Sequence, residues 1–215
     1  MQSGGSEERT KWQVKKGASY ERLVDSAMRQ FHDRGYAATR IEDIVAGTGY
    51  TAGAFYFHFK NKADCFWHAV EYRQRQRGDW SRLTADLDPA TTPLAEILDR
   101  VFGHFATTHN GMHHWALVMV DFYNQHRGDP EHQERLTATY ARWHAEIVRF
   151  VDALQEGGWV NRDRDPDVLA TQLFAATEGF RVHAALYDRD PDVMGPALVE
   201  LLASVLTRCS RHGGS

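Results

Sequence analysis

The chain has 215 residues, of which 42% are hydrophobic and 12% aromatic, and this is enough apolar material to build a packed core. Disorder is therefore excluded as the main state. The formal net charge of −4 argues at first against a nucleic-acid-binding protein, because such proteins are usually basic.

The cysteine content and the hydropathy pattern indicate a cytoplasmic protein. Cys65 and Cys209 are too few for a disulfide framework or for a thiolate metal site, which favours a reducing compartment. The longest uninterrupted apolar run covers residues 115–120, far short of the roughly 20 residues that a membrane-spanning helix needs. The polar N-terminus lacks the apolar segment of a secretion signal.

The apolar residues recur with helical spacing almost throughout, which predicts an all-α protein of about nine helices. Residues 1–18 are expected to form a flexible basic arm. Four helices are expected next: one over residues 19–33, one opening with a capping box from Thr39 to Glu42, one from Thr51 to Phe59, and one opening at Asn61. Residues 47–50, Gly-Thr-Gly-Tyr, form a tight turn between the second and the third.

The second part of the chain follows a polar stretch over residues 78–92. Five further helices are expected, over residues 93–109, 112–126, 130–155, 166–187 and about 193–208. Asp-Pro pairs begin the last three, because Asp accepts hydrogen bonds as an N-cap and Pro fits the first helical turn.

The charge is divided unevenly along the chain. Residues 1–77 hold 13 Lys and Arg against 9 Asp and Glu, whereas residues 78–215 hold 12 against 20. A basic segment of net +4 is thus joined to an acidic segment of net −8. The overall negative charge consequently says nothing against nucleic-acid binding by the first segment.

Two short helices joined by a tight glycine-containing turn are the arrangement of a helix-turn-helix, whose second helix enters the DNA major groove. The run from Phe31 to Val45, followed by residues 49–59 and Lys62, closely resembles the N-terminal domain of the TetR family of bacterial transcriptional regulators. The match extends over nearly fifty residues without a gap and stops near Val70. The resemblance implies a DNA-binding domain over residues 19–65 and a helical effector-binding and dimerisation domain over residues 66–210.

The resemblance and the side-chain chemistry together predict a set of DNA-contacting residues: Thr39, Arg40, Tyr50, Thr51, Ala52, Gly53, Tyr56, His58 and Lys62. Tyr56, His58 and Lys62 are expected to contact phosphates, while Arg40 and Tyr50 are expected to influence sequence preference. Phe55 and Phe59 are expected to point into the core. Ala52 and Phe57 depart from the polar residues that the family often carries at their positions.

The aromatic and Met-bearing helices of the second part form either a plain core or the lining of an apolar effector cavity with a few polar groups. The predicted lining is Phe102, Phe105, Trp115, Met119, Phe122, Tyr123, Trp143, Ile147, Phe174 and Glu178. The last two helices carry a second apolar stripe that needs a partner, and the resemblance implies a four-helix dimer interface there. The predicted interface is Val168, Ala175, Gly179, Val182, Leu186, Leu198, Leu202 and Val205.

Twelve histidines invite a metal hypothesis, but the spacings of zinc-protease and di-iron helices are absent. His104, His109, His113 and His114 could face one pocket, although surface or pocket-lining roles are favoured. No metal ion and no cofactor is predicted.

The chain is interpreted as a homodimeric, cytoplasmic repressor that associates with the nucleoid when it binds a palindromic operator in double-stranded DNA. A small apolar or amphipathic effector of unspecified identity is expected to release it. Two alternatives remain open. One is a constitutive helix-turn-helix protein without an effector. The other is an all-α enzyme using Glu178 or the histidines, for which no nucleophile and base arrangement is visible.

Overall fold

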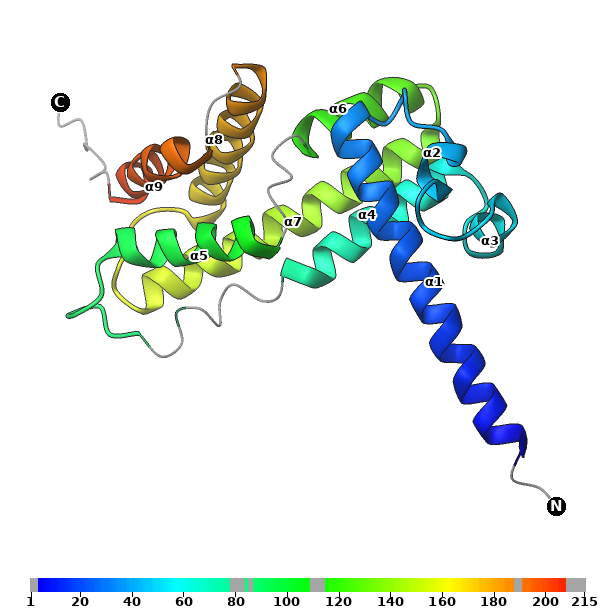
Figure 1. Ribbon diagram of the computed structural model, residues 1–215. Coiled ribbons are helices and arrows are strands. Elements are labelled where there is room, and N and C mark those ends of the chain that lie inside the picture. Colours follow the sequence, from blue (N-terminus) through cyan, green and yellow to red (C-terminus); the bar gives the residue numbers. More distant parts are fainter. Residues whose placement is uncertain (1–3, 78–83, 85–86, 109–114, 188–190, 208–215) are drawn as a thin grey trace, which may run out of the picture. The chain divides into compact units, whose positions relative to one another are not determined.

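The structure is a computed structural model that describes residues 4–77, 84, 87–108, 115–187 and 191–207, with the backbone alone for residues 4–16, 76–77, 102–108 and 191–194. Within these residues the chain forms nine α-helices and no strand (Figure 1), so the expected all-α class is confirmed. The chain divides into two compact units, residues 1–76 and residues 77–215.

The first unit contains four helices: α1 (Gly4–Arg34), α2 (Ile41–Val45), α3 (Ala52–His58) and α4 (Lys62–Arg77). Helix α1 buries one apolar stripe, which includes Leu23, Val24 and Phe31. The ring of Phe66 on α4 lies 5.9 Å from that of Phe31 and 5.3 Å from that of Tyr36 between ring centroids. Edge-on aromatic contacts of this kind add to the burial energy of the core.

Two sequence predictions for this unit need correction. Helix α1 begins at Gly4 rather than near residue 19, so residues 4–18 are helical and not a flexible arm. Glu, Arg, Lys, Gln and Ala make up about half of that stretch and favour helix; Gly4 and Gly5 lie at the helix end, and Gly17, in the interior, costs only about 1 kcal/mol. The unit also extends to residue 76 instead of 65, because α4 contributes Phe66 to the same core.

The second unit contains five helices: α5 (Leu94–Thr108), α6 (Trp115–His126), α7 (Pro130–Glu156), α8 (Pro166–Leu186) and α9 (Pro191–Thr207). Their bounds differ from the sequence expectation by only a few residues. The predicted caps are confirmed at Asp129, whose carboxylate accepts from the backbone N–H groups of Glu131 and His132, and at Asp165, which accepts from Asp167. The third predicted cap, Asp190, lies outside the described residues.

The core of the second unit is formed by α5, α7, α8 and α9. Its buried members are Ile97, Leu98, Val101, Ile147, Phe150, Val151, Leu154, Val160, Leu169, Ala170, Leu173, Leu198, Val199, Leu202 and Leu206. Mostly aliphatic side chains from four helices thus fill one interior. This core holds α7 and α8 in place, so that their other faces are presented to α6 and to solvent. None of the helices in the described part of the chain is long and apolar enough to cross a membrane.

Candidate DNA-binding surface and effector pocket

The turn between α2 and α3 is fixed by two glycines and a threonine. Gly47 and Gly49 adopt φ values of 74° and 80°, in the left-handed region that glycine tolerates without strain. The hydroxyl of Thr48 donates to the carbonyl of Val45 at 2.7 Å and accepts from the backbone N–H of Tyr50 at 3.1 Å. The turn therefore holds the start of α3 in a defined direction.

Helix α3 is anchored by its two buried phenylalanines. Phe55 and Phe59 are both fully buried, with ring centroids 5.0 Å apart, as the sequence predicts. The opposite side of the helix is open to solvent: Tyr56 is 57% exposed, and Ala52 and Gly53 are exposed as well. Thr51 caps the helix by accepting from the N–H of Ala54 at 3.4 Å. Phe57, which was not among the predicted DNA contacts, is 58% exposed on the same short helix.

Thr39 does not belong to this open surface. Its side chain is buried, and its hydroxyl donates to the carbonyls of Gln30 at 3.0 Å and Gly35 at 2.7 Å. The N-cap of α2 is Arg40, whose N–H donates to Asp43 Oδ2 at 2.9 Å. The predicted capping box of Thr39 and Glu42 is thus displaced by one residue, because the Thr39 side chain is directed to the carbonyls of Gln30 and Gly35 and not to the N–H groups of α2.

The electrostatics around Arg40 favour an ionised carboxylate at Asp43. The backbone hydrogen bond from Arg40 lowers the pKa of Asp43 below its ordinary value, and the guanidinium of Arg34, 2.6 Å away, lowers it further. Asp43 therefore stays charged at neutral pH and ties the start of α2 to the end of α1, while the Arg40 side chain is exposed.

Lys62 and His58 also face the protein in this structure. The Lys62 ammonium donates to the carbonyls of Tyr36 at 2.9 Å and Thr39 at 2.8 Å, and it lies 4.4 Å from the centroid of the Tyr36 ring. His58 Nε2 lies 2.8 Å from Ser19 Oγ. The phosphate contacts expected of Lys62 and His58 stay a prediction, which would require both side chains to leave these intramolecular contacts. The spacing alone could not show that both side chains turn toward the carbonyl and hydroxyl groups of the unit.

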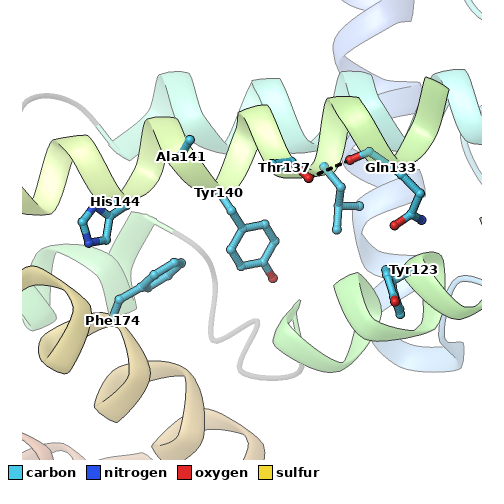
Figure 2. Close-up of a pocket in the computed structure, with 8 residues that line it drawn as sticks. Tyr123, Gln133, Thr137, Tyr140, Ala141, His144 and Phe174 are labelled. Carbon is cyan, nitrogen blue, oxygen red and sulfur yellow. Dashed lines mark hydrogen bonds between the residues drawn. The ribbon is translucent and has the colours of Figure 1, made fainter. Parts of the chain in front are cut away.

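A pocket with a volume of about 490 Å³ opens on the second unit (Figure 2). Its lining comes from α6, α7 and α8 and consists of Tyr123, Gln133, Leu136, Thr137, Tyr140, Ala141, His144 and Phe174. Figure 2 shows the ring of Tyr140 pointing away from α7 into the space between that helix, Phe174 and Tyr123. The wall is mainly apolar, and hydroxyl, amide and imidazole groups are spaced along it.

Of the predicted pocket residues, Tyr123 and Phe174 line this space. The side chains of Trp115, Met119, Phe122, Trp143 and Ile147 are buried in the packed interior instead. The side chains of Phe102 and Phe105 lie outside the described residues, and Glu178 lies beside the pocket, 3.5 Å from Arg181.

The pocket residues on α7 were not predicted, although they are evenly spaced in the sequence. Residues 133, 136, 137, 140, 141 and 144 follow one helical stripe, whereas Trp143 and Ile147 belong to the buried side of the same helix. The stripe contains both polar and apolar residues, so a search for apolar residues alone does not identify it as a pocket wall.

Tyr140 is a polar group of the pocket whose ionisation is shifted by its surroundings. Burial raises the pKa of Tyr140 to about 12, and the negative charge of Glu178 contributes to that rise. The ring is held between Trp143 and Phe174, with centroid separations of 5.1 and 5.6 Å. At neutral pH the Tyr140 hydroxyl is consequently a neutral hydrogen-bonding group at a fixed position.

The predicted dimer stripe is exposed only in part. On α8, Val168, Ala175, Gly179 and Leu186 are exposed, and Val182 is half-buried. On α9 the predicted residues Leu198 and Leu202 are buried in the core of the unit, whereas Leu201 is 41% exposed and Val205 half-buried. Leu198 and Leu202 are therefore corrected to core residues, because α9 packs that face against α5 and α8.

Comparison with known proteins agrees with this geometry. Residues 23–69 match "Bacterial regulatory proteins, tetR family", and residues 94–209, more than half of the chain, match "BetI-type transcriptional repressor, C-terminal". The chain belongs to the tetR family of bacterial regulatory proteins. It is a DNA-binding transcriptional regulator, as the resemblance implied.

Among its tetR relatives is the HTH-type transcriptional regulator YwcC of Bacillus subtilis, which is 36% identical over 181 residues, 80% of this chain and 78% of that protein. The fold is also similar to that of a TetR-family regulator from Rhodococcus sp., with a TM-score of 0.69 at 19% identity, covering 89% of this chain and 100% of that one. A second similar structure is FadR from Bacillus subtilis in complex with stearoyl-CoA, with a TM-score of 0.65 at 17% identity and coverage of 86% and 98%.

Proposed function

We propose that this regulator is a homodimeric repressor that binds an inverted-repeat operator and leaves it when a small amphipathic molecule occupies the pocket of the second unit. The observation that carries the proposal is the division of α3 into a buried anchor, Phe55 and Phe59, and an exposed side that carries Gly53 and Tyr56. A two-fold dimer presents two such helices to half-sites separated by about one turn of DNA.

The proposed DNA contacts are the predicted residues that remain at the surface: Arg40, Tyr50, Thr51, Ala52, Gly53 and Tyr56. We add Phe57 because its ring is exposed beside them. Thr51 and Tyr56 offer hydroxyls to phosphate oxygens, whereas Arg40, Tyr50 and the apolar surface of Ala52 and Phe57 are placed to read base edges and thymine methyl groups. The backbone beneath this surface is held by the side-chain contacts of Thr39, His58 and Lys62.

The proposed dimer interface consists of the exposed α8 stripe, Val168, Ala175, Gly179, Val182 and Leu186, together with Val205 and Leu201 on α9. An apolar stripe on two adjacent helices that the described part of the protomer leaves open favours an isologous contact with a second copy. An operator with two-fold symmetry requires such a dimer. Binding to it places the protein on the nucleoid in the bacterial cytoplasm.

The effector proposal rests on the chemistry of the pocket. Its long apolar wall suits a hydrocarbon or aromatic group, and the Tyr140 hydroxyl and the Gln133 amide suit a polar end. The stearoyl-CoA complex of the similar FadR shows such a ligand in a relative of the same fold. Because α6, α7 and α8 all contribute to the wall, a ligand between Tyr123 and Phe174 favours one spacing of these helices and shifts the population toward it.

The DNA-binding part of the proposal is tested by Gly53→Ala. Among the described atoms, a methyl group added at Gly53 would meet only Thr51 Oγ1 at 3.5 Å, an ordinary contact, so the fold of the protomer accommodates it. We expect affinity for the inverted repeat selected from the DNA flanking the gene to fall by about 1–3 kcal/mol, the scale of one mismatched base pair. Gly128→Ala is the matched control, since its added methyl meets no described atom within 4 Å in the second unit. Equal affinity for both variants, measured by fluorescence anisotropy, would contradict the proposed DNA surface.

The effector part is tested by filling the pocket. Ala141 lines it, whereas Ala145, one turn further along α7 and also exposed, does not. We expect Ala141→Trp to retain operator binding but to lose release by long-chain acyl and phenolic amphiphiles, and Ala145→Trp to respond as the natural chain does. A natural chain whose operator affinity is unaffected by every amphiphile that raises its melting temperature would favour the constitutive alternative.

A further inference from the structure

A cluster of two histidines and one aspartate lies at the junction of α6 and α7. His126 ends α6, Asp129 caps α7 and His132 lies in the first turn of α7. Their potential ligand atoms all lie within 4.8 Å of one another. The histidines singled out by their place in the sequence, His104, His109, His113 and His114, have side chains outside the described residues, and the group at this junction was not predicted.

The backbone of the turn determines where these three side chains start. The N–H of Asp129 donates to the carbonyl of His126 at 2.9 Å, which closes the turn. Asp129 Oδ1 accepts from the N–H groups of Glu131 at 3.0 Å and His132 at 3.4 Å. The other carboxylate oxygen, Oδ2, lies 3.9 Å from His132 Nε2. One oxygen of Asp129 therefore stabilises the helix, while the second faces the imidazole.

Phe122 positions both imidazole rings. It is fully buried, and its centroid lies 4.5 Å from that of His126 and 5.4 Å from that of His132. The two imidazole centroids are 4.5 Å apart at an interplanar angle of 81°. Rings held in this way lose less rotamer freedom on binding a shared ligand than rings on an open surface would.

We propose that His126, Asp129 and His132 form a binding site for a divalent transition metal ion of the zinc and cobalt class. Two imidazoles and one carboxylate suit these ions, whereas magnesium and calcium prefer oxygen ligands alone. Zinc holds such ligands at about 2.0–2.2 Å, so the ligand atoms must approach to about 3.3 Å of one another. The ligand atoms must therefore move by up to about 1.5 Å, and the Asp129 side chain, which is 49% exposed, can supply part of this movement. Three protein ligands leave a fourth position for water.

The site adjoins the effector pocket. The Gln133 amide donates to the carbonyl of His126 at 3.2 Å, and Gln133 itself lines the pocket. A metal ion that joins the end of α6 to the start of α7 would hold the pocket wall between Tyr123 and Gln133 in one arrangement. Metal binding and effector binding are therefore expected to affect one another.

The experiment is a titration of the full-length, chelator-treated protein with Co²⁺, followed by its visible absorption, with Zn²⁺ as competitor. We expect one site per chain, saturating at micromolar metal. His126→Gln and His132→Gln should weaken binding by at least the roughly 10–100-fold that loss of an outer-shell partner costs. Asp129→Asn keeps a good N-cap and should weaken binding without loss of helix. His68→Gln is the matched control, because His68 lies 3.9 Å from Asp64 in a pair outside the effector pocket to which the described part of the chain adds no third ligand.

Unchanged Co²⁺ affinity in both His126→Gln and His132→Gln, or the same loss in His68→Gln, would overturn the proposal and leave Asp129 as a helix cap with a neighbouring histidine. If a variant fails to fold, modification of the natural chain by diethyl pyrocarbonate decides the question. Zn²⁺ should protect His126 and His132 selectively from the reagent, and equal modification of the two with and without Zn²⁺ would refute the site.

Discussion

Replacing Lys62 with Met separates the two roles that this side chain could play. The sequence pattern predicts a phosphate contact, whereas the structure directs the ammonium to the carbonyls of Tyr36 and Thr39. Methionine keeps the length and apolar character of the side chain and removes only the charge and the donors. The variant therefore tests whether the first unit needs this ammonium to hold the turn between α1 and α2.

The expected cost follows from the contacts. Hydrogen bonds to a charged group contribute about 1.5–3 kcal/mol each, and the third contact, to Ala37 at 3.3 Å, is weaker. The Tyr36 ring beneath the ammonium adds about 0.5–1 kcal/mol. Water can solvate part of the carbonyl surface in the variant, because Lys62 is only half-buried. We therefore expect the free energy of unfolding of the first unit to fall by about 2–4 kcal/mol.

The assay combines stability with the salt dependence of DNA binding. Hydrogen exchange should show faster opening of the amides in α1, α2 and the turn between them. If Lys62 instead neutralises a phosphate, the substitution would lower the salt slope of binding, the change in log K with log salt, by about 0.9. Lys60→Met, at an exposed position two residues earlier, is the control for removal of a surface charge from the same segment.

A Lys62→Met variant as stable as the natural chain, with a salt slope lowered by about 0.9, would refute the structural role. It would return Lys62 to the DNA surface. Loss of stability with an unchanged salt slope, at a temperature where the variant is folded, would support the carbonyl contacts.

Three further results are expected. Leu202→Ala should lower the free energy of unfolding by about 2–5 kcal/mol, because the Leu202 side chain is only 1% exposed. Leu201 is 41% exposed, so Leu201→Ala should instead weaken self-association, as measured by sedimentation. The reverse pattern would contradict the assignment of the two faces of α9. Because the pKa of Tyr140 is raised to about 12, this tyrosine ionises at lower pH in the unfolded chain than in the folded one. The free energy of unfolding should therefore fall as pH rises from about 10 toward 12, and Tyr140→Phe should remove that part of the fall. Unfolding measured against pH, with an ultraviolet titration to follow the phenol, checks this. Burial and the nearby Asp64 charge raise the pKa of the Cys65 thiol. Iodoacetamide at mildly alkaline pH should therefore label Cys65 only after unfolding, as measured by peptide mass. Rapid labelling of the folded protein would show that the first unit opens.

Periodicity was sufficient to predict most of the helices. Phe55 and Phe59 are buried as expected, and the apolar stripe of α1 from Leu23 to Phe31 is buried as well, because a single apolar face on each helix leaves one way to cover it. The start of α1 was missed because charged residues with high helix propensity resemble a disordered arm when no apolar stripe marks them.

The candidate sites were predictable to a lesser degree. Tyr56 and Gly53 are at the surface as the family pattern implies, but a pattern gives the position of a residue and not the direction of a long side chain. Lys62 shows this limit, since its ammonium reaches carbonyls 23 to 26 residues earlier in the chain. Helix α9 shows it as well, because its apolar residues lie on more than one face and only packing against α5 and α8 decides that Leu202 is core and Leu201 is surface.

The sequence by itself determined the all-α class, the helix-turn-helix and the family, because these depend on local periodicity, turn glycines and residue spacing within about fifty positions. Tertiary structure decided which residues line the pocket, which face of α9 is exposed, and that His126, Asp129 and His132 converge. Those properties depend on rotation of each helix about its axis and on side-chain direction, which contacts between distant segments fix.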